Sequence, residues 1–167
     1  MPAPTTPWLL RPIRPADDAA IAAIIRTVMT EHGCSGVGFA IHDAEVACMS
    51  RHYPGGDARY CVVEHGGAVL GGAGFARLHG TTAEAATCEL RKMYFLPAAR
   101  GRGLGHALLD LLLDEMRAAG YRRCYLETTS RMQTAQYLYR QHGFAATCGP
   151  EGCTGHGGCD TFFARQL

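Results

Sequence analysis

The sequence lacks any long apolar run and has almost no excess of charge. No apolar stretch approaches the ~18 residues that cross a bilayer, and the Pro-rich start has no apolar segment typical of a signal peptide. The 16 Lys and Arg residues nearly balance the 15 Asp and Glu residues, which leaves a net charge of +1. This balance excludes a protein that binds nucleic acid or an acidic membrane mainly through electrostatic attraction. We therefore expect a cytoplasmic protein with neither nucleic acid nor membrane as a partner.

Cysteine is also too sparse for a disulfide scaffold, since 8 of 167 residues is about 5% and such scaffolds carry ~8–10%. In the cytosol these residues are expected to be free thiols. Three of them, Cys148, Cys153 and Cys159, lie close to His156 in sequence. Their C-x4-C-x2-H-x2-C spacing matches no common zinc pattern. We therefore expect no metal site.

What the sequence does contain is an ordinary globular mixture, with 47% hydrophobic and 19% charged residues. The length of 167 residues suits one domain, which we expect at 8–167 after a loose, Pro-rich tail at 1–7. Periodicity predicts strands at 8–14, 60–65, 68–78, 87–96, 121–127, 144–147 and 160–165, and helices at 17–30, 43–51, 103–119 and 131–142. Asp17 or Asp18 is expected to cap the first helix, and Gly66-Gly67 predicts a hairpin. This order is typical of an α/β (α+β) fold, in which a mixed sheet of 6–7 strands carries about four helices on its faces.

A glycine-rich turn, ARGRGLG at 99–105, lies between a predicted strand and a predicted helix. The start of a helix attracts anions through its unpaired N–H groups, and glycine lets a phosphate come close. A Walker A loop is excluded because His106-Ala107 stands where Lys-Ser/Thr is required. The dinucleotide fingerprint fails at its third glycine, which falls on His106 or Leu108. The pattern Arg/Gln-x-x-Gly-x-Gly/Ala is met by Arg100, Gly103 and Gly105.

With these residues the chain resembles the GNAT (Gcn5-related) N-acetyltransferases, small bacterial-type members in particular. CELRKMYFLPAARGRGLGHALL is similar to the family's fourth strand, pyrophosphate loop and third helix. CYLETTSRMQTAQYLYRQHGF is similar to its fifth strand and fourth helix, with the Leu-Tyr-x-x-x-Gly-Phe signature at Leu138, Tyr139, Gly143 and Phe144. The resemblance implies a mostly antiparallel sheet whose fourth and fifth strands splay apart, and acetyl-CoA as cosubstrate.

The resemblance also implies which residues bind the cosubstrate. Backbone groups of the fourth strand contact the pantetheine and the acetyl oxygen, and the turn holds the pyrophosphate. Many members place an Asn before the fourth helix, where this chain has Met132, so that Thr128 or Ser130 is expected to substitute. The expected cosubstrate-binding residues are Met93, Tyr94, Phe95, Arg100, Gly101, Arg102, Gly103, Leu104, Gly105, His106, Thr128 and Ser130.

Acetyl transfer to an amine needs a base for the ammonium proton and an acid for the departing thiolate. The resemblance places Tyr139 beside the coenzyme sulfur, and we predict it as the acid. We predict Glu89 as the base; it also shares a strand face with Arg91, so a structural ion pair is the alternative. Glu127, at the end of the next strand, is the second candidate for the base.

The sequence therefore predicts an enzyme that transfers the acetyl group of acetyl-CoA to an amine of a small molecule, amino acid or peptide by direct attack. The loops at 31–42 and 148–158 are expected to select this acceptor. The alternatives are a non-catalytic acyl-CoA-binding module and an oxidoreductase that binds NAD(P). A homodimer is compatible with the sequence.

Overall fold

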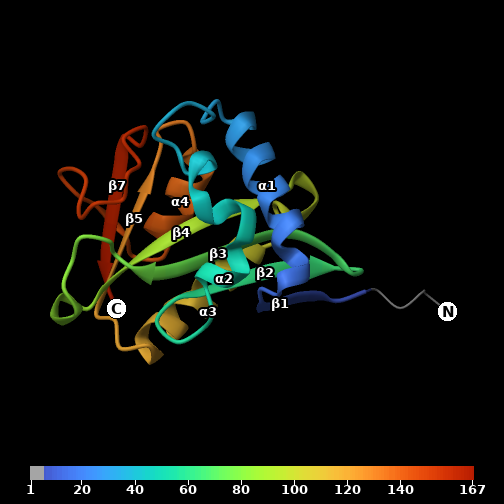
Figure 1. Cartoon of the computed structure of the whole chain (residues 1–167), viewed down its shortest axis with the longest axis horizontal. Helices are drawn as coiled ribbons and strands as arrows, with labels where there is room; N and C mark the ends of the chain where they lie inside the picture. The colour runs from blue at the N-terminus through green and yellow to red at the C-terminus, as the bar shows by residue number, and fades with distance from the viewer. Residues whose placement is uncertain (1–5) are drawn as a thin grey trace.

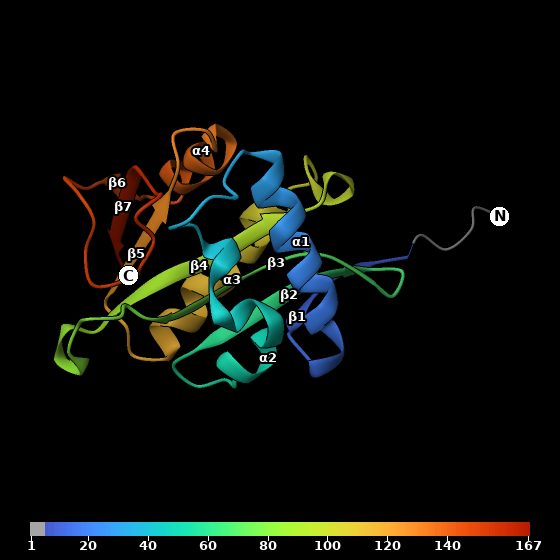
Figure 2. The same ribbon diagram turned by 45° about the horizontal axis from the view of Figure 1, so that its top comes forward.

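A mixed sheet with helices on both faces makes up the computed structural model, which describes residues 6–167 (Figures 1 and 2). The tail expected at 1–7 lies mostly outside this described part. The strands are β1 (Trp8–Pro12), β2 (Arg59–His65), β3 (Ala68–Arg77), β4 (Thr87–Phe95), β5 (Arg123–Thr128), β6 (Ala145–Ala146) and β7 (Thr161–Gln166). The α-helices are α1 (Asp18–Glu31), α2 (Met49–His52), α3 (Leu104–Ala118) and α4 (Gln133–Gln141).

The sheet opens between its two parallel strands. Within the described residues the strand order is β1-β2-β3-β4-β5-β7-β6, and every neighbouring pair is antiparallel except β4 and β5. The β4–β5 pairing ends at Glu89↔Tyr125, although β4 continues to Phe95 and β5 to Thr128. The predicted fold class and the splayed strands are confirmed.

Local signals fix several elements. Gly66 and Gly67 have φ values of 59° and 81°, which the two-residue hairpin turn between β2 and β3 requires. The helix predicted at 43–51 is instead a 3-10 turn at Ala44–Cys48 followed by the short α2. The predicted aspartate cap is wrong: Asp17 stands at the N-cap of α1 without a side-chain cap hydrogen bond, and the Asp18 carboxylate accepts hydrogen bonds from Ser50 instead. The Asp17 carboxylate accepts hydrogen bonds from the Arg11 guanidinium and the Arg14 N–H, so it does not cap α1.

Two hydrophobic layers hold the helices to the sheet. Helices α1 and α2 cover one face, whereas α3 and α4 lie on the other (Figures 1 and 2). Ile21 and Ile25 of α1 and Leu108, Leu109 and Leu112 of α3 are fully buried. Each such side chain stabilises the fold by about 1.5–3 kcal/mol. The opposite stripe of α3 is polar and exposed, as its sequence predicts.

A β-bulge interrupts β4 just beyond the point where β5 leaves it. Lys92 has a φ of 50°, and the pairing with β3 shifts between Gly74↔Arg91 and Gly72↔Tyr94. The Tyr60 hydroxyl fixes the bulge by donating a hydrogen bond of 2.9 Å to the Lys92 carbonyl. Simple alternation would send Lys92 to the face opposite Arg91. The bulge turns Lys92 toward the α1 side instead, where it meets Asp43.

Candidate active site

The glycine turn lies at the start of α3 and borders a long groove between β4 and α4. Gly101 and Gly103 have φ values of 69° and 73°, which favour glycine. A Cβ atom at either position would meet nothing within 4 Å, so the turn faces open space. The first N–H groups of α3 have no intrahelical partner. The turn therefore fits a diphosphate, whose negative charge the start of a helix favours.

Most of the residues predicted to bind the cosubstrate line this groove. They are Met93, Tyr94, Phe95, Arg100, Gly101, Gly103, Leu104, Gly105 and His106. The first turn of α4 also contributes, through Gln133 and Thr134. Sequence reasoning missed these two, because polar residues at the start of a helix are common without any ligand.

Three predicted residues lie elsewhere. Arg102 donates to the Ala98 carbonyl, and its guanidinium lies over the Trp8 ring at 5.3 Å, outside the groove lining. Ser130 donates its N–H and its hydroxyl to Asp160, and it does not line the groove either. Thr128 lines a neighbouring hollow instead.

Arg100 does line the groove, but its guanidinium is held. It forms two hydrogen bonds of 2.7 and 2.8 Å with the Glu31 carboxylate at the end of α1. A phosphate at this side chain therefore competes with Glu31.

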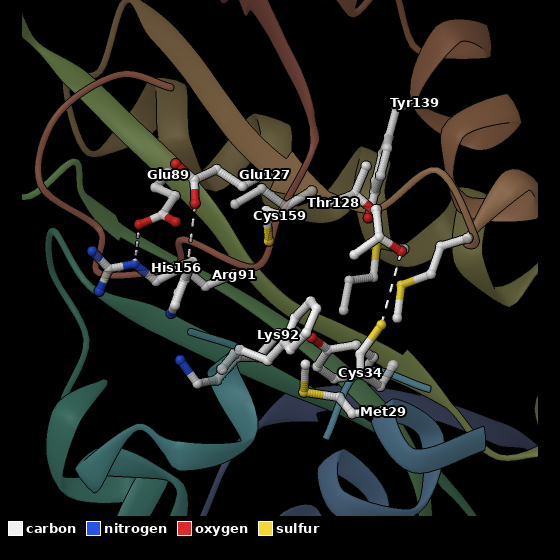
Figure 3. A pocket seen from close by; sticks show the side chains of 17 residues that line it. Met29, Cys34, Glu89, Arg91, Lys92, Glu127, Thr128, Tyr139, His156 and Cys159 are labelled. Atoms are coloured by element: carbon white, nitrogen blue, oxygen red, sulfur yellow. Dashed lines mark hydrogen bonds and ion pairs between the residues drawn. The ribbon is translucent and has the colours of Figure 1, made fainter. Parts of the chain in front are cut away.

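The neighbouring hollow, here called the inner hollow, lies where β4 and β5 separate (Figure 3). Four residues line both the inner hollow and the groove: Met93, Tyr94, Met132 and Tyr139. The two cavities therefore meet at these side chains.

Tyr139 stands at this junction. Its side chain comes from α4 and is only 6% exposed, with its ring against Phe144 and Phe163. Within residues 6–167 no hydrogen bond engages its hydroxyl, and that oxygen is not one of the fully buried polar atoms that lack a partner, so it is open to the cavity. Burial raises the pKa of Tyr139, and the nearby Cys124 thiol adds to this shift, so the hydroxyl keeps its proton at neutral pH. Tyr137 is 63% exposed and lines only the groove.

Glu89 lies at the polar end of the inner hollow and is 3% exposed. The Arg91 Nε donates a hydrogen bond of 2.7 Å to its carboxylate, and an Arg91 Nη donates to the Arg77 carbonyl. Glu89 thus forms the ion pair that the strand spacing offers as the alternative to a base.

Glu127, from the end of β5, faces the same polar end (Figure 3). The Tyr125 and Thr154 hydroxyls donate hydrogen bonds of 2.9 and 2.8 Å to its two carboxylate oxygens. Burial raises the pKa of Glu127, and the charge of Glu89 adds to the rise, although the two hydroxyls and His156 oppose it. A glutamate with a raised pKa is a better proton acceptor near neutral pH than an ordinary one.

His156 connects Glu127 to a chain of charged groups. Its Nδ1 lies 3.7 Å from Glu127, and its Nε2 lies 3.0 Å from the Asp43 carboxylate. Asp43 also pairs with the buried Lys92, whose Nζ lies 2.6 Å from Oδ2, and Lys92 contacts Glu45 at 2.5 Å. The hydrogen bond to Asp43 raises the pKa of His156, although burial opposes this.

Asp43 and His156 are 113 residues apart, so local sequence patterns do not connect them. Sequence reasoning missed both as site residues, since it considered His156 only as a zinc ligand. The signal that could have found them is the charge of β4, because a buried Lys92 requires a carboxylate partner.

A metal ion would require a rearrangement at this cluster. Ligand atoms of Glu89, Glu127 and His156 lie within 4.8 Å of one another. Each of these side chains, however, already has a protein partner, respectively Arg91, the Tyr125 and Thr154 hydroxyls, and Asp43. We assign no metal here, and its expected absence stays a prediction.

Two loops close the inner hollow, and they pack through glycines. The Gly158 N–H donates a hydrogen bond of 3.0 Å to the Gly38 carbonyl. A Cβ atom at Gly158 would lie 2.7 Å from Cζ of Phe39, which lines the hollow. The two loops predicted to select the acceptor are therefore in direct contact.

A sheet that opens beside a glycine turn, next to a buried cluster of acids and bases, fits an enzyme whose cosubstrate carries a phosphate. Comparison with known proteins agrees. The acetyltransferase (GNAT) family matches residues 21–144. An uncharacterised N-acetyltransferase of Escherichia coli (strain K12), YjgM, is 40% identical over 166 residues, which cover 99% of this chain and 98% of the relative. The chain therefore belongs to the GNAT acetyltransferase family.

Solved structures give the same result. The chain is similar to yncA of Salmonella typhimurium, a structure with its cofactor acetyl-CoA, at 25% identity and a TM-score of 0.74, over 96% of this chain and 94% of that one. A phosphinothricin acetyltransferase of Sinorhizobium meliloti in complex with AcCoA is 26% identical, with a TM-score of 0.72, over 96% and 88%. The predicted enzyme class, an acetyl-CoA-dependent N-acetyltransferase, is confirmed. Among the described residues, every helix is too short or too polar to cross a membrane.

Proposed function

We propose that the chain acetylates a protonated amine that enters the inner hollow and attacks the thioester of acetyl-CoA directly. The observation that carries this proposal is the position of Tyr139. Its hydroxyl has no hydrogen-bond partner in the described part of the chain, and its side chain lines both the groove and the inner hollow. A thioester that extends from the groove would meet an amine from the hollow at this side chain.

In this proposal the groove holds the cosubstrate by main-chain groups. The N–H groups at 103–106 bind the diphosphate, because they begin α3, and the turn at Gly103 faces open space. Beyond Glu89, β4 has no ladder to β5, so N–H groups around Met93 and Tyr94 are available to stabilise the acetyl oxygen as it gains negative charge.

The proton transfers fall to two side chains. The ammonium of the acceptor loses a proton to Glu127, and the free amine attacks the acetyl carbon. When the C–S bond breaks, the sulfur takes the proton of the Tyr139 hydroxyl, and the second proton that the attacking nitrogen loses returns to the Tyr139 oxygen. We favour Glu127 over Glu89 as the base, because the Glu89 carboxylate is paired with Arg91 whereas the pKa of Glu127 is raised by burial and by the charge of Glu89.

Tyr139→Phe tests this proposal, because it removes only the hydroxyl. We expect kcat to fall by ~10²–10⁴-fold, while calorimetry gives a Kd for acetyl-CoA within about twofold of the wild type. Tyr121→Phe is the matched control, since Tyr121 lines neither cavity and its hydroxyl donates to the Asp57 carbonyl, and it should leave both values unchanged. An unaltered kcat in Tyr139→Phe would remove Tyr139 from the mechanism.

A further inference from the structure

The polar end of the inner hollow carries an excess of negative charge. Glu89 and Glu127 face it directly (Figure 3), and Asp43 and Glu45 stand behind Lys92. Against these four carboxylates stand two permanent cations, Arg91 and Lys92. Even a protonated His156 leaves the cluster negative, and burial strengthens its interactions with any charge that enters.

Both permanent cations are already used within the protein. The Arg91 guanidinium binds the Glu89 carboxylate and the Arg77 carbonyl. The Lys92 side chain is 2% exposed and lies between Asp43 and Glu45. His156 faces a carboxylate through each ring nitrogen. A carboxylate that enters the hollow therefore has to displace a protein carboxylate from its partner, whereas an ammonium adds a missing positive charge.

Much of the remaining lining is apolar. It includes Met29 from α1, Cys34 and Phe39 from the loop after it, and Met132 before α4, together with the polar Thr128 and Thr129. Methionine side chains adjust their shape to different apolar groups. These side chains therefore offer an apolar surface to an alkyl or aryl group of the acceptor.

From these contacts we infer that the acceptor is a small primary amine on an apolar chain, with no carboxylate beside the nitrogen. This inference rests on the proposed function, because it assumes that the acceptor occupies the inner hollow. It divides the predicted acceptors: free α-amino acids are poor substrates, and their decarboxylated or amidated counterparts are good ones.

Matched trios of acceptors test the inference. One trio is phenylalanine, phenylalaninamide and 2-phenylethylamine; the other is leucine, leucinamide and 3-methylbutylamine. We expect kcat/KM for both carboxylate-free members of each trio to exceed that of the amino acid about tenfold or more, because like charges in a buried site repel strongly. The amides control for substitution beside the nitrogen, and free thiol release reports turnover.

The outcomes separate this inference from the proposed function. Amino acids that match or exceed their amines would overturn the inference and leave acetyl transfer by Tyr139 intact. Failure of all six compounds would also overturn it, because the acceptor class would then be wrong. In that case acetyl-CoA binding, and turnover with peptide amines, would decide the proposed function separately.

A variant tests the origin of the selectivity. Glu89→Gln removes one negative charge and releases Arg91, so the preference for amines over amino acids should shrink several-fold. The ratio of the kcat/KM values of two substrates, measured on one enzyme preparation, does not depend on the fraction of the enzyme that is folded. Glu64→Gln is the control, since Glu64 pairs with Arg11 on β1 and lies outside the hollow lining, and it should leave the ratio unchanged. An unaltered ratio in Glu89→Gln would contradict the electrostatic explanation.

Discussion

Replacing Lys92 by Met should destabilise the protein strongly at neutral pH. The Lys92 side chain is 2% exposed and lies 2.6 Å from Asp43 and 2.5 Å from Glu45. Breaking a buried pair costs ~3–5 kcal/mol because a charge stays buried without a partner. The side chains of Asp43 and Glu45 are 26% and 17% exposed, so water offsets part of the cost of leaving them unpaired. We therefore expect the free energy of unfolding to fall by about 3 kcal/mol. Met keeps the length of the chain and the conformation of the bulge.

The loss should depend on pH in a definite direction. Burial acts to raise the pKa of Asp43 and Glu45, but Lys92 and other partners overcome it and hold both below the ordinary 3.8 and 4.5. Groups with a lowered pKa stabilise the folded state above their unfolded pKa, and this contribution disappears as the pH falls through the folded pKa. The wild type therefore loses it below about pH 4.5. The variant lacks it already at pH 7, so the gap between the two proteins should narrow as the pH is lowered.

Urea denaturation at pH 7 and pH 4 measures both effects. At pH 7 the unfolding midpoint of Lys92→Met should drop by about 1–2 M. Arg117→Met is the control, because Arg117 and Asp114 form an exposed pair, 42% and 79% exposed, and such pairs contribute ~0–1 kcal/mol. A loss no larger than this control, or an equal gap at both pH values, would refute the reasoning.

Two further predictions concern the inner hollow. Gly158→Ala should raise the KM of the acceptor several-fold without changing the KM of acetyl-CoA, because the added Cβ displaces Phe39. Gly157→Ala is the control in the same steady-state assay, since a Cβ at Gly157 meets nothing within 4 Å. Equal acceptor KM values in the two variants would contradict the predicted effect of the loop contact. In the pH profile of kcat/KM, activity should fall on the acidic side around a midpoint above 4.5, because burial and Glu89 raise the pKa of Glu127 from that value. Glu127→Gln should abolish this acidic limb, and its persistence would exclude Glu127 as the base.

The sequence predicted the elements whose signals are local. The Gly66-Gly67 hairpin and the glycine turn before α3 depend on short patterns, and the structure confirms them. The aspartate cap of α1 was wrong for a tertiary reason. Arg11, on β1, reaches the Asp17 carboxylate with two hydrogen bonds, and these compete with the helix N–H groups for the same oxygens.

The acidic end of the site was only partly predictable. Alternation along a strand predicted that Glu89 and Arg91 share one face. The bulge at Lys92 breaks that alternation, and no sequence pattern predicted the bulge. Asp43 and His156 come from loops whose conformation depends on contacts between segments far apart in the chain. Tyr139 was found through the family resemblance, since helical spacing alone describes an ordinary buried tyrosine.

The short pairing between β4 and β5 has a consequence for the whole molecule. In the described chain, only three residue pairs join these two strands, from Thr87↔Arg123 to Glu89↔Tyr125. Beyond these pairs, β5, α4, β6 and β7 are joined to the rest of the molecule by packing against α3 and by loop contacts such as that of Gly158 with Gly38. If acetyl-CoA lies across the gap between β4 and β5, it stabilises the folded protein as well as supplying the acetyl group, since a ligand that binds the native state shifts the folding equilibrium. The concentration of acetyl-CoA would then affect the stability of the folded enzyme as well as the rate of acetyl transfer.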